Sequence, residues 1–477
     1  MTIYSSKNVR KLAFVQPMID DGNLTPPLGI LTMASIMEKE GWEVRFFDER
    51  IDSDILSDIT GFKPNIVGIS AVTTSVLRGR QLATDIKNAL PDVVTVFGGP
   101  HPTAMPEEVL GWDPVDFVVV GEGEYALRDL GQWIIAGMDS LELANIPNLC
   151  YKTDKGIIKN PIRASLKPEE LDMLPRPAFH ILNLEQIFRN TRHGLFQKGK
   201  RVLPVMGSRG CPNRCTFCCR VMGFKIRYRD TKLLIEEIET MVSDYAMDEV
   251  YFEDDNFTVN RQRAIAFLDS FIERNLGIYI KFANGIRADA VDAEVLEKMK
   301  KAGCYSISFG IESGSPRVIE MMRKNLSLEK AKENVKIAKS MGLLVGANCI
   351  IGYPGETVAD IEESLDYFMN LDLDSMAVVN LIPFPGTEVR RICEEKGYLT
   401  PEAKNWNNYI FDINNPKILI ETEFISSEYL LNKINQTYRN IYLNPKRVFR
   451  LLKHMKPRDI ISGAKLMLTK IVPSVNK

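Results

Sequence analysis

Four of the eight cysteines in this chain of 477 residues lie between positions 211 and 219, in the segment GSRGCPNRCTFCCR. Cys211, Cys215 and Cys218 are separated by three and then two residues, directly beyond a predicted strand. Thiolates at such close spacing on one loop are natural ligands of iron–sulfur clusters. Three ligands leave one iron of a 4Fe–4S cluster open to bind a substrate. The pattern therefore predicts that these three cysteines hold a catalytic cluster.

A structural zinc site is the alternative interpretation of this segment, and it would need four protein ligands. Cys219 could complete the four, although adjacent cysteines tend to point apart. The nearest histidine, His193, lies across a predicted strand. The other cysteines are scattered along the chain, which favours small buried side chains at Cys150, Cys304, Cys349 and Cys393.

The cysteine segment resembles the radical S-adenosylmethionine superfamily, whose hallmark is Cys-x3-Cys-x-aromatic-Cys, with Phe217 at the aromatic position. The resemblance covers residues 201–390. The segment EDDNF lies where the family binds the amino group of the methionine, and the segment FGIESG lies where the family holds the ribose. The segment GANCIIGYPGE resembles the family's strand that lines the adenine pocket. It implies S-adenosylmethionine contacts from Phe217, Glu253, Asp254, Asp255, Arg287, Glu312, Ser313 and Gly352.

Some of these assignments have a plain structural alternative. The three acidic residues from Glu253 to Asp255 could cap a helix start, where carboxylates are favoured. The sequence does not indicate which of them would meet the ligand, and the family's Gly-Gly-Glu pattern is absent. Arg287 could neutralise a carboxylate or pair with Asp289. Glu312 suits the ribose because a carboxylate accepts hydrogen bonds from two adjacent hydroxyls.

A second set of candidates follows three predicted strands within the first 150 residues. Small and hydroxyl-bearing residues come after NIVGIS, VVTVF and VDFVVV, which alternate with helical patterns and so predict parallel strands. Ligands bind at the carboxyl ends of such strands. Glycines there let a large flat ligand approach the backbone. Tight strand-to-helix turns are the alternative explanation.

The segments PPLG, GISAVTT, FGGPHPT and VGEGE resemble, in that order, the cobalamin-binding domain of the cobalamin-dependent radical branch. The Asp-x-His-x-x-Gly signature of some cobalamin proteins is absent, so ligation of the lower cobalt face stays open. Methylthiotransferases are disfavoured because only Cys150 precedes the cysteine segment. His101 could reach the corrin or structure its own loop. The resemblance implies cobalamin contacts from Pro27, Leu28, Ser70, Thr73, Gly98, Gly99, His101, Gly121, Glu122 and Gly123.

The elements that must position these residues predict an α/β fold with several domains. Residues 1–150 predict a Rossmann-like cobalamin-binding domain, and the proline-rich residues 151–200 predict an interdomain linker segment. Residues 201–395 predict six strands with intervening helices, typical of a partial (β/α)6 TIM-type barrel with its working residues at the strand carboxyl ends. Residues 396–477 break this rhythm and predict a mainly helical basic region.

The composition limits the possible partners. Hydrophobic residues make up 45% of the chain and charged residues 26%, and 60 Lys and Arg nearly balance 62 Asp and Glu, which argues against a nucleic-acid partner. The absence of a signal peptide and of long apolar runs favours a cytoplasmic location. From residue 441 onward, the sequence contains nine Lys or Arg residues and one acidic residue, Asp459. This tail predicts either peripheral membrane contact or a terminal helix with a solvated basic face.

The resemblance implies an enzyme that receives one electron from a reductant such as flavodoxin or ferredoxin. It would cleave S-adenosylmethionine to a 5′-deoxyadenosyl radical and, by way of cobalamin, methylate an unactivated carbon of a lipid, terpenoid or other natural product. Oxidative cyclisation or skeletal rearrangement of a tetrapyrrole or lipid is the alternative. The open cluster site disfavours a non-catalytic cobalamin or metal carrier. No side chain identifies the small-molecule substrate.

Overall fold

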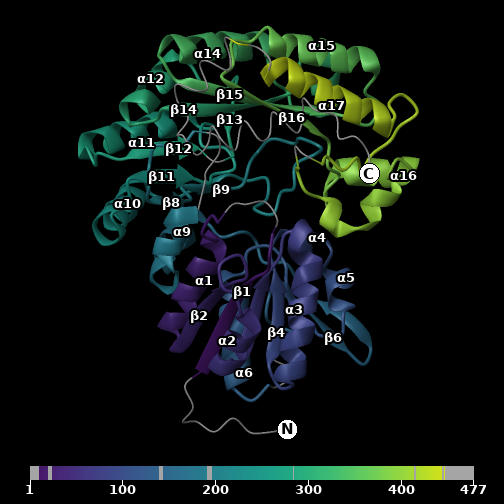
Figure 1. Cartoon of the computed structure of the whole chain (residues 1–477). Helices are drawn as coiled ribbons and strands as arrows, with labels where there is room; N and C mark the ends of the chain where they lie inside the picture. The colour runs from purple at the N-terminus through teal and green to yellow at the C-terminus, as the bar shows by residue number, and fades with distance from the viewer. Residues whose placement is uncertain are drawn as a thin grey trace. The chain divides into compact units, whose positions relative to one another are not determined.

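The computed structural model describes residues 10–19, 24–138, 143–190, 196–282, 284–412, 415–442 and 445. The chain divides into two compact units (Figure 1). The N-terminal unit comprises Met1–Thr191, Cys219–Gly223 and Arg227–Arg229, and the C-terminal unit comprises Arg192–Cys218, Phe224–Ile226 and Asp230–Lys477. His193 and the basic tail beyond residue 445, on which two sequence expectations depend, lie outside the described residues.

A seven-stranded sheet with the order β2-β1-β3-β4-β5-β6-β7 forms the centre of the N-terminal unit. The first five strands are parallel, and β6 and β7 extend the sheet in antiparallel fashion. The strand order reverses between β1 and β3, and ligands of doubly wound folds bind at such a switch point. The strands are β1 (Arg10–Gln16), β2 (Trp42–Asp48), β3 (Ile66–Ser70), β4 (Val94–Gly98), β5 (Phe117–Val119), β6 (Leu149–Thr153) and β7 (Gly156–Lys159).

Helices cover both faces of this sheet because its strands are apolar on both sides. Ile66 of β3 belongs to a core shared with the first and sixth helices, whereas Ile69 faces α3, where it lies 3.2 Å from the place of a β-carbon on Gly79. Parallel strands buried on both faces read as continuous apolar runs. The helices are α1 (Leu28–Lys39), α2 (Ile55–Phe62), α3 (Val76–Ala89), α4 (Pro100–Ala104), α5 (Pro106–Leu110), α6 (Glu124–Ile135), α8 (Pro168–Met173) and α9 (Leu184–Asn190), with short 3-10 turns at Thr73–Ser75 and Phe179–Ile181.

The C-terminal unit carries two parallel sheets, with the orders β12-β11-β8 and β13-β14-β15-β16. A parallel bridge between Ile280 and Cys304 joins the edge of the first sheet to the chain just before β14. The main strands therefore follow one another around a partial (β/α)6 barrel, which confirms the predicted fold class. The strands of this half of the chain are β8 (Val202–Val205), β9 (Ser208–Arg209), β10 (Arg227–Tyr228), β11 (Glu249–Phe252), β12 (Tyr279–Phe282), β13 (Ile286–Arg287), β14 (Ser306–Glu312), β15 (Leu344–Ile351) and β16 (Ser375–Asn380).

The barrel helices named below, except α13, begin at polar residues whose side chains accept a hydrogen bond from a backbone N–H of the first turn. Such caps satisfy donors that have no partner inside the helix, and here they are Asp230, Asn260, Asp292, Ser327, Thr357 and Thr387. The helices are α10 (Thr231–Tyr245), α11 (Arg261–Arg274), α12 (Ala293–Lys301), α13 (Pro316–Met321), α14 (Leu328–Ser340), α15 (Val358–Met369) and α16 (Glu388–Lys396), and 3-10 turns follow at Pro401–Lys404 and Trp406–Asn408.

The last described helix, α17 (Ser427–Tyr442), covers the open edge of the barrel at β16 (Figure 1). The hydroxyl of the buried Tyr438 donates to the carbonyl oxygen of Val378 at 3.0 Å and accepts from its N–H at 3.1 Å. An uncovered edge strand would offer these groups to another chain. None of the helices in the described ranges has both the length and the apolar character needed to span a bilayer.

Candidate functional site

The predicted cluster ligands lie on one loop of the C-terminal unit, after β9. Cys215 is buried, Cys211 is half-buried, and Cys218 is exposed, as is its neighbour Cys219. The Cys218 thiol donates a hydrogen bond to the sulfur of Cys215, which lowers the pKa of Cys215 to about 6 and raises the pKa of Cys218. Thiolates are the forms that bind iron. The donor set of this loop therefore fits an iron–sulfur cluster.

Within the described ranges, no three side chains of Cys, His, Asp or Glu are grouped so that they could hold a metal ion. The ligands of an iron–sulfur cluster do not need to converge on one ion, because each thiolate binds a different iron.

Thr216 anchors the cysteine loop to three other parts of the barrel. Its backbone N–H donates to the carbonyl oxygen of Met322 at 3.1 Å, and its own carbonyl oxygen accepts from the N–H of Val389 at 3.0 Å. Its hydroxyl lies 2.8 Å from the hydroxyl of Tyr353. Met322 follows α13, Tyr353 follows β15 and Val389 lies in the first turn of α16. The cysteine loop is therefore held by three different parts of the barrel.

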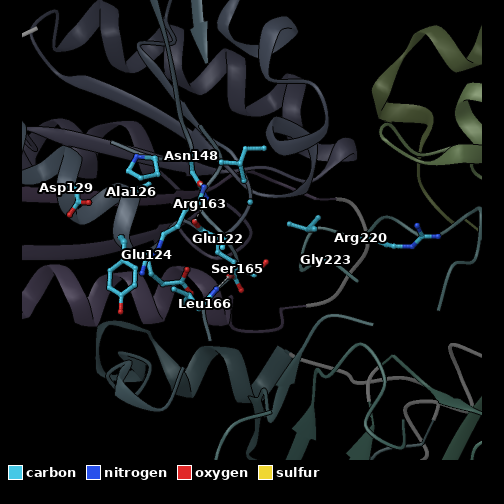
Figure 2. A pocket seen from close by; sticks show the side chains of 16 residues that line it. Glu122, Glu124, Ala126, Asp129, Asn148, Arg163, Ser165, Leu166, Arg220 and Gly223 are labelled. Carbon is cyan, nitrogen blue, oxygen red and sulfur yellow. Dashed lines mark hydrogen bonds between the residues drawn. The ribbon is translucent and has the colours of Figure 1, made fainter. Parts of the chain in front are cut away.

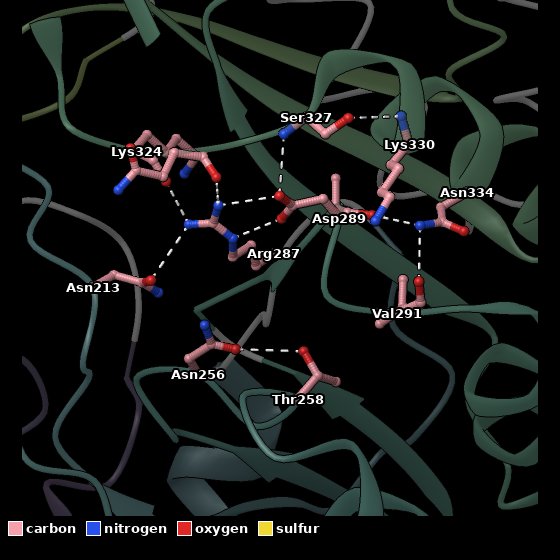
Figure 3. A network of polar contacts seen from close by, with 12 residues as sticks. Asn213, Asn256, Thr258, Arg287, Asp289, Val291, Lys324, Ser327, Lys330 and Asn334 are labelled. Carbon is pink, nitrogen blue, oxygen red and sulfur yellow. Dashed lines mark hydrogen bonds and ion pairs between the residues drawn. The ribbon is translucent and has the colours of Figure 1, made fainter. Parts of the chain in front are cut away.

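Arg287, at the end of β13, connects the cysteine loop with the chain after α13 (Figure 3). Its guanidinium pairs with the carboxylate of Asp289 at 2.6 Å and donates to the carbonyl oxygen of Lys324 at 2.6 Å. It also reaches the side-chain oxygen of Asn213 at 3.4 Å, and the Asn213 amide donates to the sulfur of Cys211 at 3.4 Å. The sequence left open whether Arg287 neutralises a ligand carboxylate or pairs with Asp289, and the structure shows the pairing with Asp289.

Lys324 is a further candidate site residue, which the sequence did not reveal. Its ammonium lies 3.2 Å from a carboxylate oxygen of Glu312 and 5.9 Å from the centre of the Phe217 ring. The side chains of Lys324 and Glu312 are only 9% and 13% exposed. The positive charges of Lys324 and of Arg287 also contribute to the lowered pKa of Cys215. A buried ammonium beside the cysteine loop suits an anionic group of a ligand.

Glu312 has a backbone conformation that non-glycine residues rarely adopt. Its φ is +71°, and the register of β14 against β15 shifts between Gly310 and Glu312. The left-handed conformation of a non-glycine residue costs about 1–3 kcal/mol and is found mostly where function requires it. The strained residue is the one that the sequence predicts to contact the ribose.

The two aspartates after β11 stabilise the approach to the cysteine loop. The buried Asp254 accepts hydrogen bonds from the N–H of Gly207 at 2.9 Å and the hydroxyl of Ser208 at 2.5 Å. Asp255 accepts from the N–H of Gly210 at 3.0 Å. Both carboxylates therefore hold the backbone that leads into the cluster segment.

Glu253 differs from these aspartates. Burial, and secondly the negative charge of Asp254, raise the pKa of Glu253 to about 7. The helix-cap alternative for this segment is wrong, because α11 begins at Arg261 and its cap is Asn260, whose side-chain oxygen accepts from the N–H of Arg263 at 3.1 Å.

Ser313 lies inside the barrel wall, although its neighbour Glu312 ends β14. Its fully buried hydroxyl is 2.7 Å from that of Ser364 and accepts from the N–H of Ser315 at 3.1 Å. These bonds fix the turn into α13. The geometry gives Ser313 a role in the turn.

Gly352 follows β15 with a φ of +83°. Its N–H donates to the carboxyl group of Glu356 at 2.5 Å, and burial raises the pKa of that group to about 8. A β-carbon on Gly352 would lie 3.0 Å from a methyl group of Leu430 on α17. The predicted adenine strand therefore ends in a tight turn that α17 covers.

The loops after β3 and β4 of the N-terminal unit are joined mainly through the backbone. The N–H of Ala71 donates to the carbonyl oxygen of Gly98 at 2.9 Å, and the N–H of His101 donates to that of Ala71 at 3.3 Å. Gly99 has a φ of +100°, and a β-carbon there would lie 2.9 Å from the carbonyl oxygen of Ala71 and 3.2 Å from the hydroxyl of Ser70. These loops form a cradle that only a glycine allows, which fits a large ligand that approaches the backbone at the carboxyl ends of these strands.

His101 is 1% exposed, and its imidazole lies 3.3 Å from the hydroxyl of Thr73. Burial lowers the pKa of His101 to about 4. The side chain is therefore neutral near pH 7 and connects the same two loops. Of the remaining predicted cobalamin residues, Pro27 and Leu28 form the start of α1, and Gly123 precedes α6.

The loop after β5 contains Gly121, Glu122 and Gly123. The N–H of Gly121 donates to the hydroxyl of Thr103 at 2.9 Å. The carboxylate of Glu122 pairs with the guanidinium of Arg227 at 2.8 Å. Glu122 also lines a cavity of ≈ 140 Å³. Figure 2 shows lining residues of this cavity, among them Glu124, Asn148, Arg163, Ser165 and Arg220.

The two units match two families. Residues 18–131 match the model of the B12 binding domain, and residues 205–368 match that of the Radical SAM superfamily. The chain is 31% identical over 432 residues to an uncharacterized methyltransferase of Pyrococcus horikoshii, covering 89% of either chain. It is 25% identical over 447 residues to the anaerobic magnesium-protoporphyrin IX monomethyl ester cyclase of Rubrivivax gelatinosus, covering 91% of this chain and 78% of the relative.

A similar solved structure is that of the radical S-adenosylmethionine methyltransferase TsrM from Kitasatospora setae with cobalamin and a [4Fe-4S] cluster bound. The TM-score is 0.72 at 20% identity, with 95% of this chain and 92% of the other covered. This likeness shows that the fold is shared.

Proposed function

Because this chain belongs to the radical S-adenosylmethionine family with a cobalamin-binding domain, we propose that it methylates an unactivated carbon of a small natural product. The cofactors of this family are a 4Fe–4S cluster, S-adenosylmethionine and cobalamin. When bound, they supply reductive cleavage of S-adenosylmethionine and transfer of a methyl group. The observation that carries the proposal is the placement of the buried Lys324–Glu312 pair beside the cysteine loop.

Cys211, Cys215 and Cys218 would hold the cluster. The support is the short spacing of these residues, the lowered pKa of Cys215 and the anchoring of the loop through Thr216 and Arg287. Cys219 would take no part, because three thiolates already leave the one open iron that the chemistry needs.

Three charged side chains would bind S-adenosylmethionine. Glu312 would accept hydrogen bonds from the ribose hydroxyls, and Lys324 would pair with the methionyl carboxylate. Glu253 would face the amino group, since Asp254 and Asp255 bond to the loop backbone. The turn at Gly352 would border the adenine, and Phe217 would exclude water from the reacting centre.

The N-terminal unit would hold cobalamin over the loops that follow β3, β4 and β5. Gly98 and Gly99 would let the corrin approach the backbone, while Ser70 and Thr73 would offer hydroxyls to its amide side chains. Pro27 and Leu28, at the start of α1, would border the same face. His101 would support this surface as a neutral side chain.

The substrate is a small molecule, and we propose a lipid, terpenoid or comparable natural product with an unactivated carbon. A one-electron carrier such as flavodoxin or ferredoxin would supply the electron. We place the protein in the cytoplasm, with peripheral membrane contact through the basic tail as the route to an apolar substrate.

Anaerobic reconstitution with iron and sulfide, followed by S-adenosylmethionine and a strong reductant, tests the cleavage step. We expect 5′-deoxyadenosine, and its complete absence from a preparation with a full cluster would contradict the proposal. Methyl-labelled S-adenosylmethionine then distinguishes methylation from the cyclisation that the Rubrivivax relative is named for. Label in the product of a candidate substrate supports methylation, whereas an unlabelled cyclised product contradicts it.

A further inference from the structure

The segment that directly follows the third predicted cluster ligand belongs to the N-terminal unit. Cys218 is the last residue of the cysteine loop in the C-terminal unit, whereas Cys219–Gly223 and Arg227–Arg229 group with the N-terminal unit. The chain therefore leaves the cluster loop and enters the cobalamin-binding unit at once. The regular secondary structure of this segment is limited to the short strand β10 (Arg227–Tyr228).

A buried ion pair within the N-terminal unit joins this segment to the loop after β5. The guanidinium of Arg227 lies 2.8 and 2.9 Å from the two carboxylate oxygens of Glu122, and the two side chains are 3% and 9% exposed. The pair joins β10 to the loop after β5, 105 residues earlier in the chain. An ion pair this deeply buried persists only where further hydrogen bonds satisfy both partners.

Those further bonds are present, and they come from two more segments. The N–H of Leu166 donates to Glu122 at 2.8 Å, and the carbonyl oxygen of Leu166 accepts from Arg227 at 2.9 Å. Arg227 also donates to the carbonyl oxygen of Met222 at 2.8 Å. One carboxylate and one guanidinium thus fix the strand-end loop, the segment before α8 and the segment after the cluster loop.

The cavity beside the pair shows the same convergence (Figure 2). Its lining combines Gly121 and Glu122 with residues 162–166 and with Arg220, Val221 and Gly223. Gly223 has a φ of +80°, and a β-carbon there would lie 3.7 Å from the hydroxyl of Ser165. The segment after the cluster loop therefore lies against residues 162–166.

We propose that Glu122 and Arg227 are a positioning pair that ties the segment after the cluster loop into the cobalamin-binding unit, to which this segment belongs. This inference rests on the proposed function and gives Glu122 a different role from the cobalamin contact that the sequence suggested. The pair would act on methyl transfer only through the segment that follows Cys218, so Glu122 and Arg227 are positioning residues.

Trypsin tests the tie without any cofactor, because Arg220, Lys225 and Arg229 are cleavage sites in the segment. Glu122→Gln keeps the shape of the side chain and removes its charge. We expect cleavage of the full chain at these sites to become faster by about tenfold or more, since a broken buried pair favours local opening. The control is Glu107→Gln, which breaks an exposed pair with Lys159 in the same unit and should leave the rate unchanged. Equal protection of Glu122→Gln and the natural protein would overturn the proposal.

A second variant decides the matter if Glu122→Gln does not fold. Arg227→Lys keeps the charge but cannot reach two carboxylate oxygens and two carbonyl oxygens at once. We expect intermediate protection in a chain with native circular dichroism. Full protection in Arg227→Lys would contradict the proposed tie.

A functional readout separates positioning from general stability. The reconstituted protein is given S-adenosylmethionine and titanium(III) citrate, which reduces both the cluster and cobalamin. Reductive cleavage yields 5′-deoxyadenosine, and loss of the methyl cation to reduced cobalt yields S-adenosylhomocysteine. We expect Glu122→Gln to lower the ratio of S-adenosylhomocysteine to 5′-deoxyadenosine about tenfold, with Glu107→Gln unchanged.

An unchanged ratio in a folded Glu122→Gln variant would overturn the positioning role. If the natural protein forms neither nucleoside, the proposed function fails, while the protease experiment still decides whether the pair holds the segment.

Discussion

The strand ends of the two units present different surfaces to their ligands. In the C-terminal unit, charged side chains surround the cysteine loop: Lys324 pairs with Glu312, and Arg287 with Asp289. In the N-terminal unit, the loops after β3 and β4 meet through backbone hydrogen bonds and a glycine. The difference matches the ligands, since S-adenosylmethionine is small and charged whereas a corrin is broad and needs close backbone approach.

Backbone strain is distributed in the same way. In the C-terminal unit Glu312 itself adopts a positive φ of +71°, so a residue that we propose to bind S-adenosylmethionine bears the cost of the strain. In the N-terminal unit the comparable position is Gly99, with a φ of +100°, where no side chain is present to be strained. The site around the cysteine loop thus depends on particular charged side chains. The cradle in the N-terminal unit depends on the absence of a side chain at Gly99.

The largest expected effect is at the cysteine loop. Cys218→Ala should reduce formation of 5′-deoxyadenosine to background, because the cluster loses one of its three ligands. Cys219→Ala is the matched control at the adjacent position and should retain the activity. Iron content and nucleoside yield measure both variants. Activity in Cys218→Ala together with its loss in Cys219→Ala would show that the ligand assignment is wrong.

Removal of the buried ammonium should weaken binding of S-adenosylmethionine. We expect Lys324→Met to raise the KM for S-adenosylmethionine about 10- to 100-fold, the equivalent of one charged hydrogen bond. Lys330→Met, at an exposed lysine shown in the same network, should leave the KM unchanged. Steady-state assays of 5′-deoxyadenosine measure this effect. An unchanged KM in Lys324→Met would remove Lys324 from the binding site.

The glycine cradle can be tested against a second glycine with the same φ of +100°. Gly99→Ala combines a left-handed backbone with a contact of 2.9 Å to Ala71, whereas Gly137 has the same φ of +100° and nothing within 4 Å of an added β-carbon. Both variants should lose about 1–3 kcal/mol of stability. Only Gly99→Ala should lose bound cobalamin, measured by absorbance after gel filtration. Equal cobalamin content in the two variants would contradict the cradle.

The smallest expected effect is the pH dependence of stability that comes from His101. Its folded-state pKa of about 4 lies below the ordinary value of 6.5, so its contribution is present above pH 6.5 and is lost as the pH falls toward 4. The unfolding free energy should drop by about 2 kcal/mol between pH 7 and pH 5 through this group. His101→Gln should abolish that part of the decline in urea titrations, and a Gln at the exposed His180 should not. An identical decline in His101→Gln would show that His101 is not the source.

The sequence was sufficient for the fold class, the family, the kind of enzyme and its cofactors, all of which are confirmed. These conclusions rest on local signals: the spacing of three cysteines and apolar runs that end in glycines. The domain limits and the roles of individual residues remain predictions.

Tertiary contacts explain what the sequence could not reveal. Lys324 lies in an ordinary RKN segment, and only the packing of that segment on the cysteine loop brings its ammonium to Glu312. Asp254 resembles a ligand contact in the sequence, yet its partners are backbone and hydroxyl groups 46 and 47 residues earlier. Ser313 turns into the barrel wall toward Ser364. No periodicity or spacing encodes such pairings.

Electron paramagnetic resonance of the reduced cluster, recorded with and without S-adenosylmethionine, tests the central claim most directly. A cluster held by Cys211, Cys215 and Cys218 alone has an open iron, so its spectrum should change when S-adenosylmethionine binds. The change should need a higher concentration in Lys324→Met and be unaffected in Cys219→Ala. A spectrum that S-adenosylmethionine leaves unaltered would mean that the cluster has no open iron, which would contradict the account.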